Sequence, residues 1–443
     1  MGLSRRISLV RFLWAQNSPL KFFSKLALDS SDVNYVQIGA RSIVLLKNPD
    51  LVQQLLVKDA VATRKGRTKE RALFFRFLGD GLLNSEDPAH RRQRRLILPA
   101  FHRSRLTGYG DAVVNTAIAH SSVWRNGEVR DLGADMSALT LAVVANTLFS
   151  ADVKDTAEGI ATAFNQLTSN INRMMFPGAT WLLKLPVPFA KRIQYAQDTL
   201  NAMVNALIQK RRSEGKDTGD LLSMLLLAED AERPGEHLSD NEVRDQAMTL
   251  FFAGHETTSN ALTWVFWLLS QHSDIEDKLH AELAQVLNGR VPSYDDFPRL
   301  VVTEQIVREV MRLYPPVWTI GRQTTEQLTF GDYQTPKGSL IIASQWIIHR
   351  DPRWFAQPLA FRPERWTPEF RASIPRFAYF PFGGGSRSCI GENFAWMELV
   401  LIVATIAQRW RFTLTHDAHC VTPQGRITLH PDRSVRLRLH KRG

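Results

Sequence analysis

Residues 239–271 are the part of the chain that most restricts its fold. Ser239 and Glu242 have the spacing of a capping box, in which the serine accepts a bond from a backbone N–H and the glutamate reaches back to the serine. The helical pattern that follows predicts a single rod of about 48 Å, at 1.5 Å per residue. Because so long and so apolar a rod must be covered by other elements, we expect it to cross the centre of the protein.

The remaining sequence predicts a mainly helical domain with small sheets, an α+β fold. Residues 88–287 are helical in pattern almost throughout, and a second capping box, Ser273 with Glu276, predicts where the next helix begins. Pro298 predicts the start of a further helix that ends at Tyr314. No shift in composition marks a linker, so we expect one domain over residues 1–443, with residues 1–32 as a lead-in segment. Strand patterns occur at residues 33–46, 327–333 and 339–348 and beyond residue 412, a loop is expected over 352–388, and helix over 392–408.

The composition, 44% hydrophobic, allows a large buried core, but no run reaches the roughly 20 apolar residues that a membrane-spanning helix needs. The longest candidate, residues 250–269, is interrupted by His255, Glu256 and Asn260. Residues 1–14 carry three arginines among apolar residues and lack the apolar run of a signal peptide. Two cysteines fit a reducing compartment. We therefore expect a cytoplasmic protein whose amphipathic start could rest on a membrane surface.

The net charge of +11, from 55 basic and 44 acidic residues, favours acidic partners such as nucleic acid, anionic lipid or an acidic protein. A solvated basic surface without specific meaning is an equal alternative. No basic patch interleaved with aromatic residues is present, so we do not expect nucleic-acid binding.

The segment 382–391, Phe-Gly-Gly-Gly-Ser-Arg-Ser-Cys-Ile-Gly, is the sharpest chemical feature. A lone cysteine is usually a small buried hydrophobic residue. Here three glycines let the backbone approach a flat ligand closely, and Arg387 can meet a carboxylate. Cys389 also precedes the predicted helix 392–408, whose N-terminus favours a thiolate, the form that binds metals. Cys389 is therefore a candidate metal ligand.

Three other polar patterns stand out. Glu309 and Arg312 have the spacing of an ordinary surface ion pair, but they lie in an apolar helix, where an unpaired charge would be costly. Residues 253–258, Ala-Gly-His-Glu-Thr-Thr, could be a simple polar kink in the long helix. An acid beside an alcohol in a buried apolar rod nevertheless favours a functional reason over a kink. His90 and Arg94, four residues apart, share one face of a basic helix that is more often a solvated surface.

Together these motifs resemble the cytochrome P450 family over residues 33–439, in the family's order. The segment 382–391 matches the haem-binding pattern Phe-x-x-Gly-x-Arg-x-Cys-x-Gly at every fixed position. The resemblance implies one cytochrome P450 domain with haem b buried between the long helix and the helix after Cys389, whose thiolate is the axial ligand of the iron. It also implies that Arg365, from the segment 361–366, joins Glu309 and Arg312 in a structural charge network that locks the haem loop.

The same resemblance assigns roles to the other motifs. Glu256 is expected to relay protons and Thr257 to organise the water beside the bound oxygen, whereas His255 receives no role. The helix that begins near His90 resembles the family's propionate-binding helix, in which the position of His90 is usually a tryptophan. The residues expected to contact the haem, with the propionates held by the first four, are His90, Arg94, Arg322, Arg387, Phe382, Gly383 and Ala253.

The function implied is a monooxygenase that inserts one oxygen atom from O2 into a mainly apolar substrate, by hydroxylation or epoxidation of a fatty acid, terpene or steroid-like molecule. Arg71 or Arg426 could meet a substrate carboxylate. The segments expected to line the pocket are residues 70–83, 170–189, 251–252, 317–320 and 424–427, with Phe74, Phe75, Phe77, Met174, Met175, Phe176, Trp181 and Trp318 as their large apolar side chains.

No dinucleotide-binding fingerprint or cysteine set for an iron–sulfur cluster is present, so electrons are expected from a separate ferredoxin- or flavodoxin-type protein. Arg91, Arg92 and Arg95 could attract such an acidic donor. Two alternatives remain open: a family member that uses or rearranges peroxides, against which the pair Glu256 and Thr257 counts, and a haem sensor or carrier without turnover.

Overall fold

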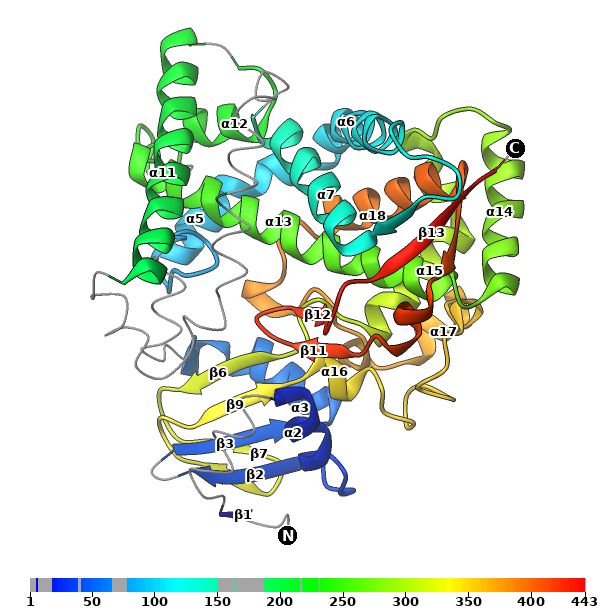
Figure 1. The fold of residues 1–443 in the computed structure, drawn as a ribbon. Coiled ribbons are helices and arrows are strands. Elements are labelled where there is room, and N and C mark those ends of the chain that lie inside the picture. The colour runs from blue at the N-terminus through cyan, green and yellow to red at the C-terminus, as the bar shows by residue number, and fades with distance from the viewer. Residues whose placement is uncertain are drawn as a thin grey trace.

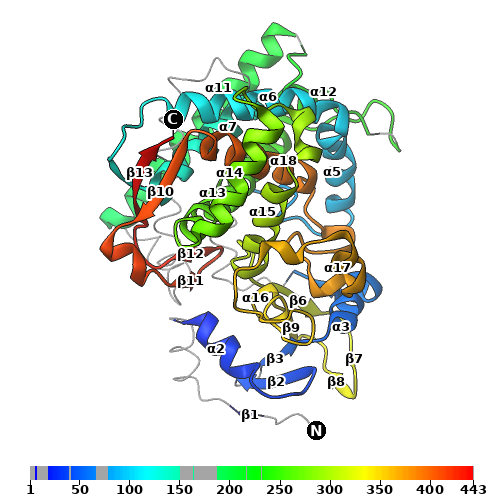
Figure 2. The same ribbon diagram turned by 90° about the vertical axis from the view of Figure 1, so that its right-hand side faces the viewer.

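The computed structural model describes residues 5–6, 18–38, 41–65, 78–149, 163, 187–215, 217–230 and 232–442. A large helical part stands above a six-stranded sheet in both Figure 1 and Figure 2. The predicted mainly helical fold with small sheets is thus the one observed, while the single domain over residues 1–443 stays a prediction. None of the helices in the described ranges is long and apolar enough to cross a membrane.

The helical part is built around α13 (Asp240–Leu269), which runs across the middle of the molecule with α7 (Leu132–Phe149) packed along it (Figure 1). Both bonds of the predicted capping box between Ser239 and Glu242 are present. The other helices are α2 (Pro19–Leu26), α3 (Pro49–Gln53), α5 (Ala89–Ile97), α6 (Arg103–Ser121), α11 (Pro188–Glu214), α12 (Leu221–Leu227), α14 (Ser273–Leu287), α15 (Val301–Leu313), α16 (Gln345–Ile348), α17 (Pro368–Ser373) and α18 (Glu392–Ala407).

The main apolar core lies where α6, α7, α13, α15 and α18 meet. Trp264 and Phe266 of α13 are fully buried in it, as is most of α18. A long and largely apolar helix is stable only when neighbouring elements cover most of it, and α13 packs against α7, α11, α15 and α18. The predicted central position of this helix is confirmed.

The sheets join segments that are far apart in the sequence. The six-stranded sheet has the order β1-β2-β3-β9-β6-β4, in which β2 and β3 form a hairpin and β3 pairs in parallel with β9, Ile43 opposite Leu340. A second sheet has the order β10-β13-β5, and β7-β8 and β11-β12 are separate hairpins. The strands are β1 (Arg5–Arg6), β2 (Val33–Ile38), β3 (Arg41–Leu46), β4 (Thr63–Arg64), β5 (Val129–Asp131), β6 (Ile320–Thr324), β7 (Leu328–Phe330), β8 (Tyr333–Thr335), β9 (Leu340–Ala343), β10 (Trp410–Leu414), β11 (Pro423–Gly425), β12 (Leu429–Pro431) and β13 (Arg436–Lys441).

Three local predictions were wrong. The second capping box does not form, although α14 begins at Ser273 as predicted. The cap position is His272, which makes no side-chain cap bond, and the Glu276 carboxylate binds Arg411 of β10 at 2.6 Å. Pro298 lies inside a 3₁₀ helix, Tyr294–Arg299, and α15 starts after it at Val301. The strand pattern at residues 339–348 covers only β9, since the last residues turn into α16.

Candidate active site

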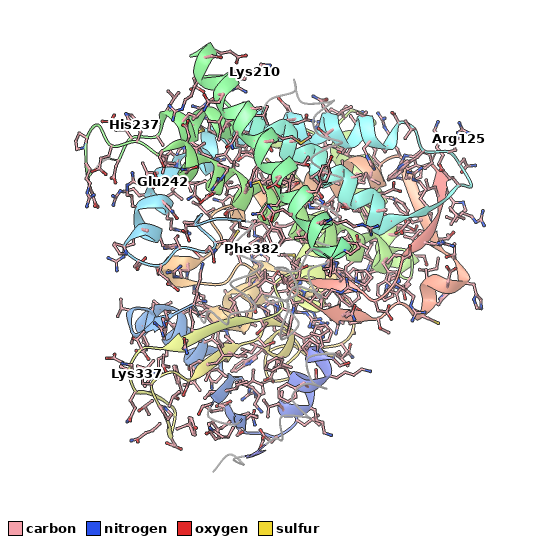
Figure 3. The ribbon with its side chains drawn as sticks, turned by 60° about the vertical axis from the view of Figure 1, so that its left-hand side comes forward. Arg125, Lys210, His237, Glu242, Lys337 and Phe382 are labelled. Carbon is pink, nitrogen blue, oxygen red and sulfur yellow. The ribbon has the colours of Figure 1, made fainter. Side chains whose placement is uncertain are left out.

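The segment 382–391 forms a tight loop before α18. Phe382 lies near the middle of the molecule, between the helical part and the sheet (Figure 3). Its carbonyl accepts a 2.9 Å hydrogen bond from the N–H of Cys389, which closes the loop. Gly385 has a φ of +70°, and a Cβ on it would overlap with the carbonyl of Leu56. At this position, therefore, the glycine allows the loop to press against the backbone of its own protein, and not only against a flat ligand.

The sulfur of Cys389 is accessible although protein surrounds it. The side chain has exposed surface, yet burial raises the pKa of its thiol to about 11, against the opposing effects of the Gly391 N–H and the charge of Arg94. The sulfur therefore lies beside an internal space. The start of α18 does not by itself make this thiol ionise, contrary to the expectation from the helix terminus. A metal ion bound to the sulfur would do so, because its charge deprotonates a coordinating thiol.

One face of α13 also opens onto an internal space. Every residue from Gln246 to Leu269 is buried except Ala253, Gly254 and Thr257, which are half-buried. Ala253 and Thr257 are four residues apart and so lie on one face of the helix. The Thr257 hydroxyl donates a 2.7 Å hydrogen bond to the carbonyl of Ala253, which leaves the lone pairs of the hydroxyl oxygen free to accept.

Glu256 points away from this opening, into a buried polar cluster. Its Oε1 accepts a 3.0 Å hydrogen bond from the Thr428 hydroxyl and lies 2.8 Å from Nε2 of His430. Burial opposes ionisation, but the hydrogen bonds from His430 and Thr428 and the charges of His430 and His255 outweigh it and lower the pKa of Glu256 to about 2. No pattern in the sequence indicates this cluster, because β12 follows α13 by more than a hundred residues.

His255 ties α13 to α7. Its Nε2 lies 3.0 Å from the Ser137 hydroxyl, and its carbonyl accepts from Thr140 at 3.2 Å. Burial lowers the pKa of the ring, although the charge of Glu256 acts in the opposite direction. A neutral histidine that joins two helices agrees with the absence of a catalytic assignment at this position.

The four basic residues expected to hold the propionates are close enough to influence one another. His90 is buried, and burial together with the charge of Arg387 lowers the pKa of its ring to about 4, with Arg94 acting in the same direction. Burial and the charge of Arg387 also lower the pKa of Arg322 to about 10. Burial is the larger cause of these lowered pKa values and neighbouring positive charge the smaller one, and buried basic groups close together favour an anionic ligand.

Arg94 and Arg387 hold the loop in place as well. Arg94 donates to the carbonyl of Ser388 at 2.7 Å, directly beside the cysteine. Arg387 donates to the carbonyl of Ser85 at 2.9 Å and to the carboxylate of Glu86 at 2.5 Å. The cluster of basic groups and the cysteine are thus parts of one connected structure, and this set of donors fits a haem with its two carboxylates.

The predicted network around Glu309 is present and buried. Arg312 donates two bonds to its carboxylate at 2.9 and 2.8 Å, Arg365 donates one at 3.1 Å, and the indole of Trp366 donates one at 2.9 Å. The side chains of Glu309 and Arg312 are fully buried. So many donors to one carboxylate offset the cost of removing its charge from water.

His349 connects this network to the cysteine loop, a role that the sequence did not reveal. Arg312 donates to the carbonyl of His349 at 2.7 Å, and Nε2 of the His349 ring accepts from the backbone N–H of Phe380 at 3.0 Å. The carbonyl of Phe380 in turn accepts from the N–H of Gly383 at 2.9 Å. Burial and the charges of Arg312 and Arg350 lower the pKa of His349 well below its usual range, and only a neutral ring can accept at Nε2.

Some predicted features lie elsewhere or are not described. Arg92 and Arg95 bind the buried Asp230, and Arg92 also binds Glu242, so neither carries a free positive charge for a docking partner. Arg91 pairs with Asp87 at 3.2 Å but is exposed. Of the predicted substrate-pocket residues, Arg426 binds the Gln424 side chain. Trp318, Phe251 and Phe252 are buried. The predicted pocket residues outside the described ranges are Arg71, Phe74, Phe75, Phe77, Met174, Met175, Phe176 and Trp181.

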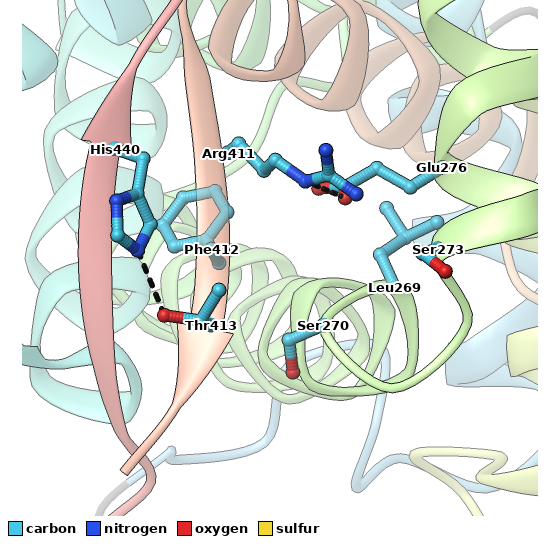
Figure 4. Close-up of a pocket in the computed structure, with 8 residues that line it drawn as sticks. All are labelled: Leu269, Ser270, Ser273, Glu276, Arg411, Phe412, Thr413 and His440. Carbon is cyan, nitrogen blue, oxygen red and sulfur yellow. Dashed lines mark hydrogen bonds and ion pairs between the residues drawn. The ribbon is translucent and has the colours of Figure 1, made fainter.

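A hollow of about 450 Å³ at the far end of α13 is a different feature (Figure 4). It lies between Leu269, Glu276 and the sheet strands β10 and β13. Its polar groups bind one another: Arg411 pairs with Glu276 at 2.6 Å, and Thr413 bonds with His440 at 2.8 Å. With these groups already paired, the hollow offers little to orient a substrate.

The comparison with known proteins decides the family. The family model "Cytochrome P450" matches residues 4–435. The chain belongs to the cytochrome P450 family. It is 40% identical to cyclooctatin synthase of Streptomyces melanosporofaciens, over 89% of this chain and 85% of that protein. It is 35% identical to pentalenene oxygenase of Streptomyces avermitilis, over 96% of this chain and 93% of that protein.

The fold of this cytochrome P450 has close counterparts among solved structures. The crystal structure of the cytochrome P450DA haem domain superimposes with a TM-score of 0.89 at 28% identity, covering 100% of this chain and 99% of that one. The predicted fold is therefore confirmed. The predicted enzyme class, a haem-dependent monooxygenase of the cytochrome P450 family, is confirmed by the family match and by relatives named as oxygenases.

Proposed function

We propose that Cys389 is the axial thiolate ligand of haem b and that this monooxygenase oxidises a terpenoid. The observation that carries the first part is the accessible sulfur of Cys389 deep inside the protein, beside a cluster of buried basic groups. The second part is supported by relatives whose names refer to terpenoids: cyclooctat-9-en-7-ol 5-monooxygenase, 38% identical, and pentalenene oxygenase. It also agrees with the apolar side chains expected around the pocket.

The residues proposed to hold the haem surround the cysteine loop and one face of α13. Cys389 would bind the iron, and Phe382, Gly383 and Ala253 would contact the flat ring. The bound haem would supply the binding and reductive activation of O2. The basic groups proposed to neutralise its two propionates are His90, Arg94, Arg322 and Arg387.

The chain's own polar residues would manage protons. Because the Thr257 hydroxyl donates to the carbonyl of Ala253, its oxygen can accept a hydrogen bond from a water molecule and fix that water's orientation. Glu256, ionised in its buried cluster, would take up protons and pass them toward Thr257. The network of Glu309, Arg312 and His349 would keep the cysteine loop in one position.

Electrons are proposed to come from a separate iron–sulfur or flavin protein of the ferredoxin or flavodoxin type. Since Arg92 and Arg95 are paired within the chain, they are removed from its proposed docking site. Two assays separate a monooxygenase from a peroxide-using relative. Substrate oxidation that requires the electron donor indicates a monooxygenase, and substrate oxidation with peroxide alone indicates the relative. Loss of all substrate oxidation in both assays would favour a haem sensor or carrier.

The ligand assignment is tested by the spectrum of the reduced, carbon-monoxide-bound protein. The wild type should show the red-shifted Soret band of thiolate ligation, and Cys389→Ser should lose it. Cys420→Ser is the matched control, because Cys420 is the other free cysteine and is also exposed. A red-shifted band that persists in Cys389→Ser would overturn the assignment. A binding titration in which only small polar molecules shift the spectrum would overturn the terpenoid proposal.

A further inference from the structure

The hairpin β11–β12 holds two polar side chains against the carboxylate of Glu256. Thr428 and His430 both contact its Oε1, and they also contact each other at 2.7 Å. The amide of Asn260 lies 3.3 Å from the Thr428 hydroxyl and donates to the carbonyl of Glu256 at 2.8 Å. The hairpin therefore contacts α13 through specific side chains at the one acid of the proposed proton route.

Backbone bonds fix the hairpin in this position. The N–H of Leu429, between the two polar residues, donates to the carbonyl of Pro316 at 2.8 Å. The indole of Trp318 donates to the carbonyl of Arg426 at 2.8 Å, and that of Trp264 lies 3.4 Å from the carbonyl of Leu429. Leu429 itself is fully buried. The hairpin that carries His430 is thus held in place independently of the contact between His430 and Glu256.

The two ends of the contact differ in their access to solvent. The side chain of His430 is 27% exposed, whereas that of Glu256 is 11% exposed. The charged and titratable groups that act on the Glu256 carboxylate are His430 from the hairpin and His255 from α13. Of these two, His255 is almost completely buried and binds Ser137. His430 is therefore the basic group through which water can exchange protons with Glu256.

We propose that His430 is a positioning residue that supplies protons to Glu256 during turnover, an inference that rests on the proton-relay role proposed for Glu256. One proton moves from Nε2 of the His430 imidazolium to Oε1 of the Glu256 carboxylate, and the carboxyl group so formed then passes that proton toward Thr257 and becomes a carboxylate again. The neutral ring then regains one proton from bulk water, so one proton enters for each that leaves and no electrons move. Imidazole is suited to this exchange because its ordinary pKa lies near neutral pH.

The alternative is that His430 only anchors Glu256, and two variants separate the two roles. In His430→Gln the amide N–H can still donate to Glu256, but the side chain cannot titrate. In Thr428→Val the anchoring bond of the hydroxyl is lost, while the titratable ring remains. Proton supply predicts that the first variant is the more impaired, and simple anchoring predicts the reverse. His440→Gln is the control, because His440 binds Thr413 at the surface of another sheet.

The first measurement is product formed per pair of electrons consumed, with the peroxide released, in H2O and D2O. In His430→Gln product per electron pair should fall by about tenfold or more, because positioned proton transfer contributes up to about 10²–10⁴-fold. Peroxide release should rise and the solvent isotope effect should increase. The carbon-monoxide spectrum and the melting temperature should stay as in the wild type. His440→Gln should change none of these. A His430→Gln enzyme with wild-type coupling would overturn the inference.

The second measurement does not depend on turnover. In the reduced, carbon-monoxide-bound protein with isotopically labelled histidine, NMR follows the ring nitrogens of His430. Because Nε2 of the ring lies 2.8 Å from Oε1 of Glu256, Glu256→Gln should shift the His430 signals and leave those of His440 unchanged. Unchanged His430 signals would overturn the inference even if His430→Gln folds poorly. If Glu256→Gln turns over normally, the proposed role of Glu256 fails. If Glu256→Gln is impaired but His430→Gln is not, only the role of His430 is refuted.

Discussion

The Thr258 hydroxyl of α13 donates a 3.1 Å hydrogen bond to Oε2 of Glu398 on α18. Glu398 is fully buried, and its other oxygen, Oε1, has no hydrogen-bond partner in the described part of the chain. Burial raises the pKa of Glu398 to about 8, although the bond from Thr258 acts in the opposite direction. At neutral pH the contact between the two central helices therefore contains a protonated acid.

This contact should make the stability of the protein depend on pH. Because the pKa of Glu398 is raised from 4.5 to about 8 on folding, its contribution is complete below pH 4.5 and is lost as the pH rises toward 8. Between pH 6 and 8 the loss is at most about 1.4 kcal/mol per pH unit. Glu398→Gln should remove this dependence, measured by unfolding in urea across that range. Glu326→Gln, at an exposed position, serves as the control, and a Glu398→Gln profile parallel to the wild type would contradict the expectation.

The network around Glu309 should be essential for folding. Arg312→Leu leaves a fully buried carboxylate short of its main partner, so the free energy of unfolding should fall by about 3–5 kcal/mol. Arg365→Leu should cost less, because Arg312 still binds the carboxylate. Arg362→Ala is the control, since its pair with Glu364 is exposed and should contribute less than about 1 kcal/mol. Equal urea midpoints for Arg312→Leu and Arg362→Ala would refute this account.

The two neighbouring threonines of α13 should behave differently in turnover. Thr257 is half-buried on the open face, so Thr257→Ala should lower product per electron pair about tenfold and release the difference as peroxide. Thr257→Ser should keep most of the coupling, because the hydroxyl remains. Thr258→Val, which removes only the bond to Glu398, should stay coupled. The reverse order of effects would show that the open face is not where oxygen reacts.

The basic cluster should determine how tightly haem is held. Arg387→Ala removes a charged donor from that cluster, and bonds to charged groups contribute about 1.5–3 kcal/mol, so haem should transfer to an apomyoglobin trap about ten- to a hundredfold faster. Arg91→Ala, an exposed position on the neighbouring helix, should transfer haem at the wild-type rate. Equal rates in the two variants would exclude propionate binding by Arg387.

The sequence predicted those features that depend on residues close together along the chain, such as helix starts and buried helix faces. Ser239, Glu242 and the apolar run after them placed α13 to within two residues at its end, because the cap and the covered faces belong to the helix itself. The pair Ser273 and Glu276 has the same spacing, and α14 begins at Ser273, but no side-chain cap forms because the cap position is His272. The spacing therefore predicted where the helix begins but not how its end is capped.

Residues whose roles depend on distant partners could not be predicted. His349, Glu398 and His430 have no motif around them, and each is recognised only through its contacts with residues distant in the sequence. The residues named beforehand, such as Glu309 and Arg312, were recognised because their spacing and apolar surroundings are visible in one helix. Buried single contacts across the fold leave no such pattern in the sequence.

The parallel pairing of β3 with β9 has a consequence for how this chain is synthesised. Ile43 and Leu340 are opposite each other in the sheet, although about 300 residues of chain separate them. At roughly 5–20 residues per second, the β2–β3 hairpin waits about 15 to 60 s on the ribosome before its neighbour exists. During that time one edge of the hairpin is open to other chains. Yield in a foreign host should therefore depend on chaperones that cover such an edge early, more than on the stability of the finished enzyme.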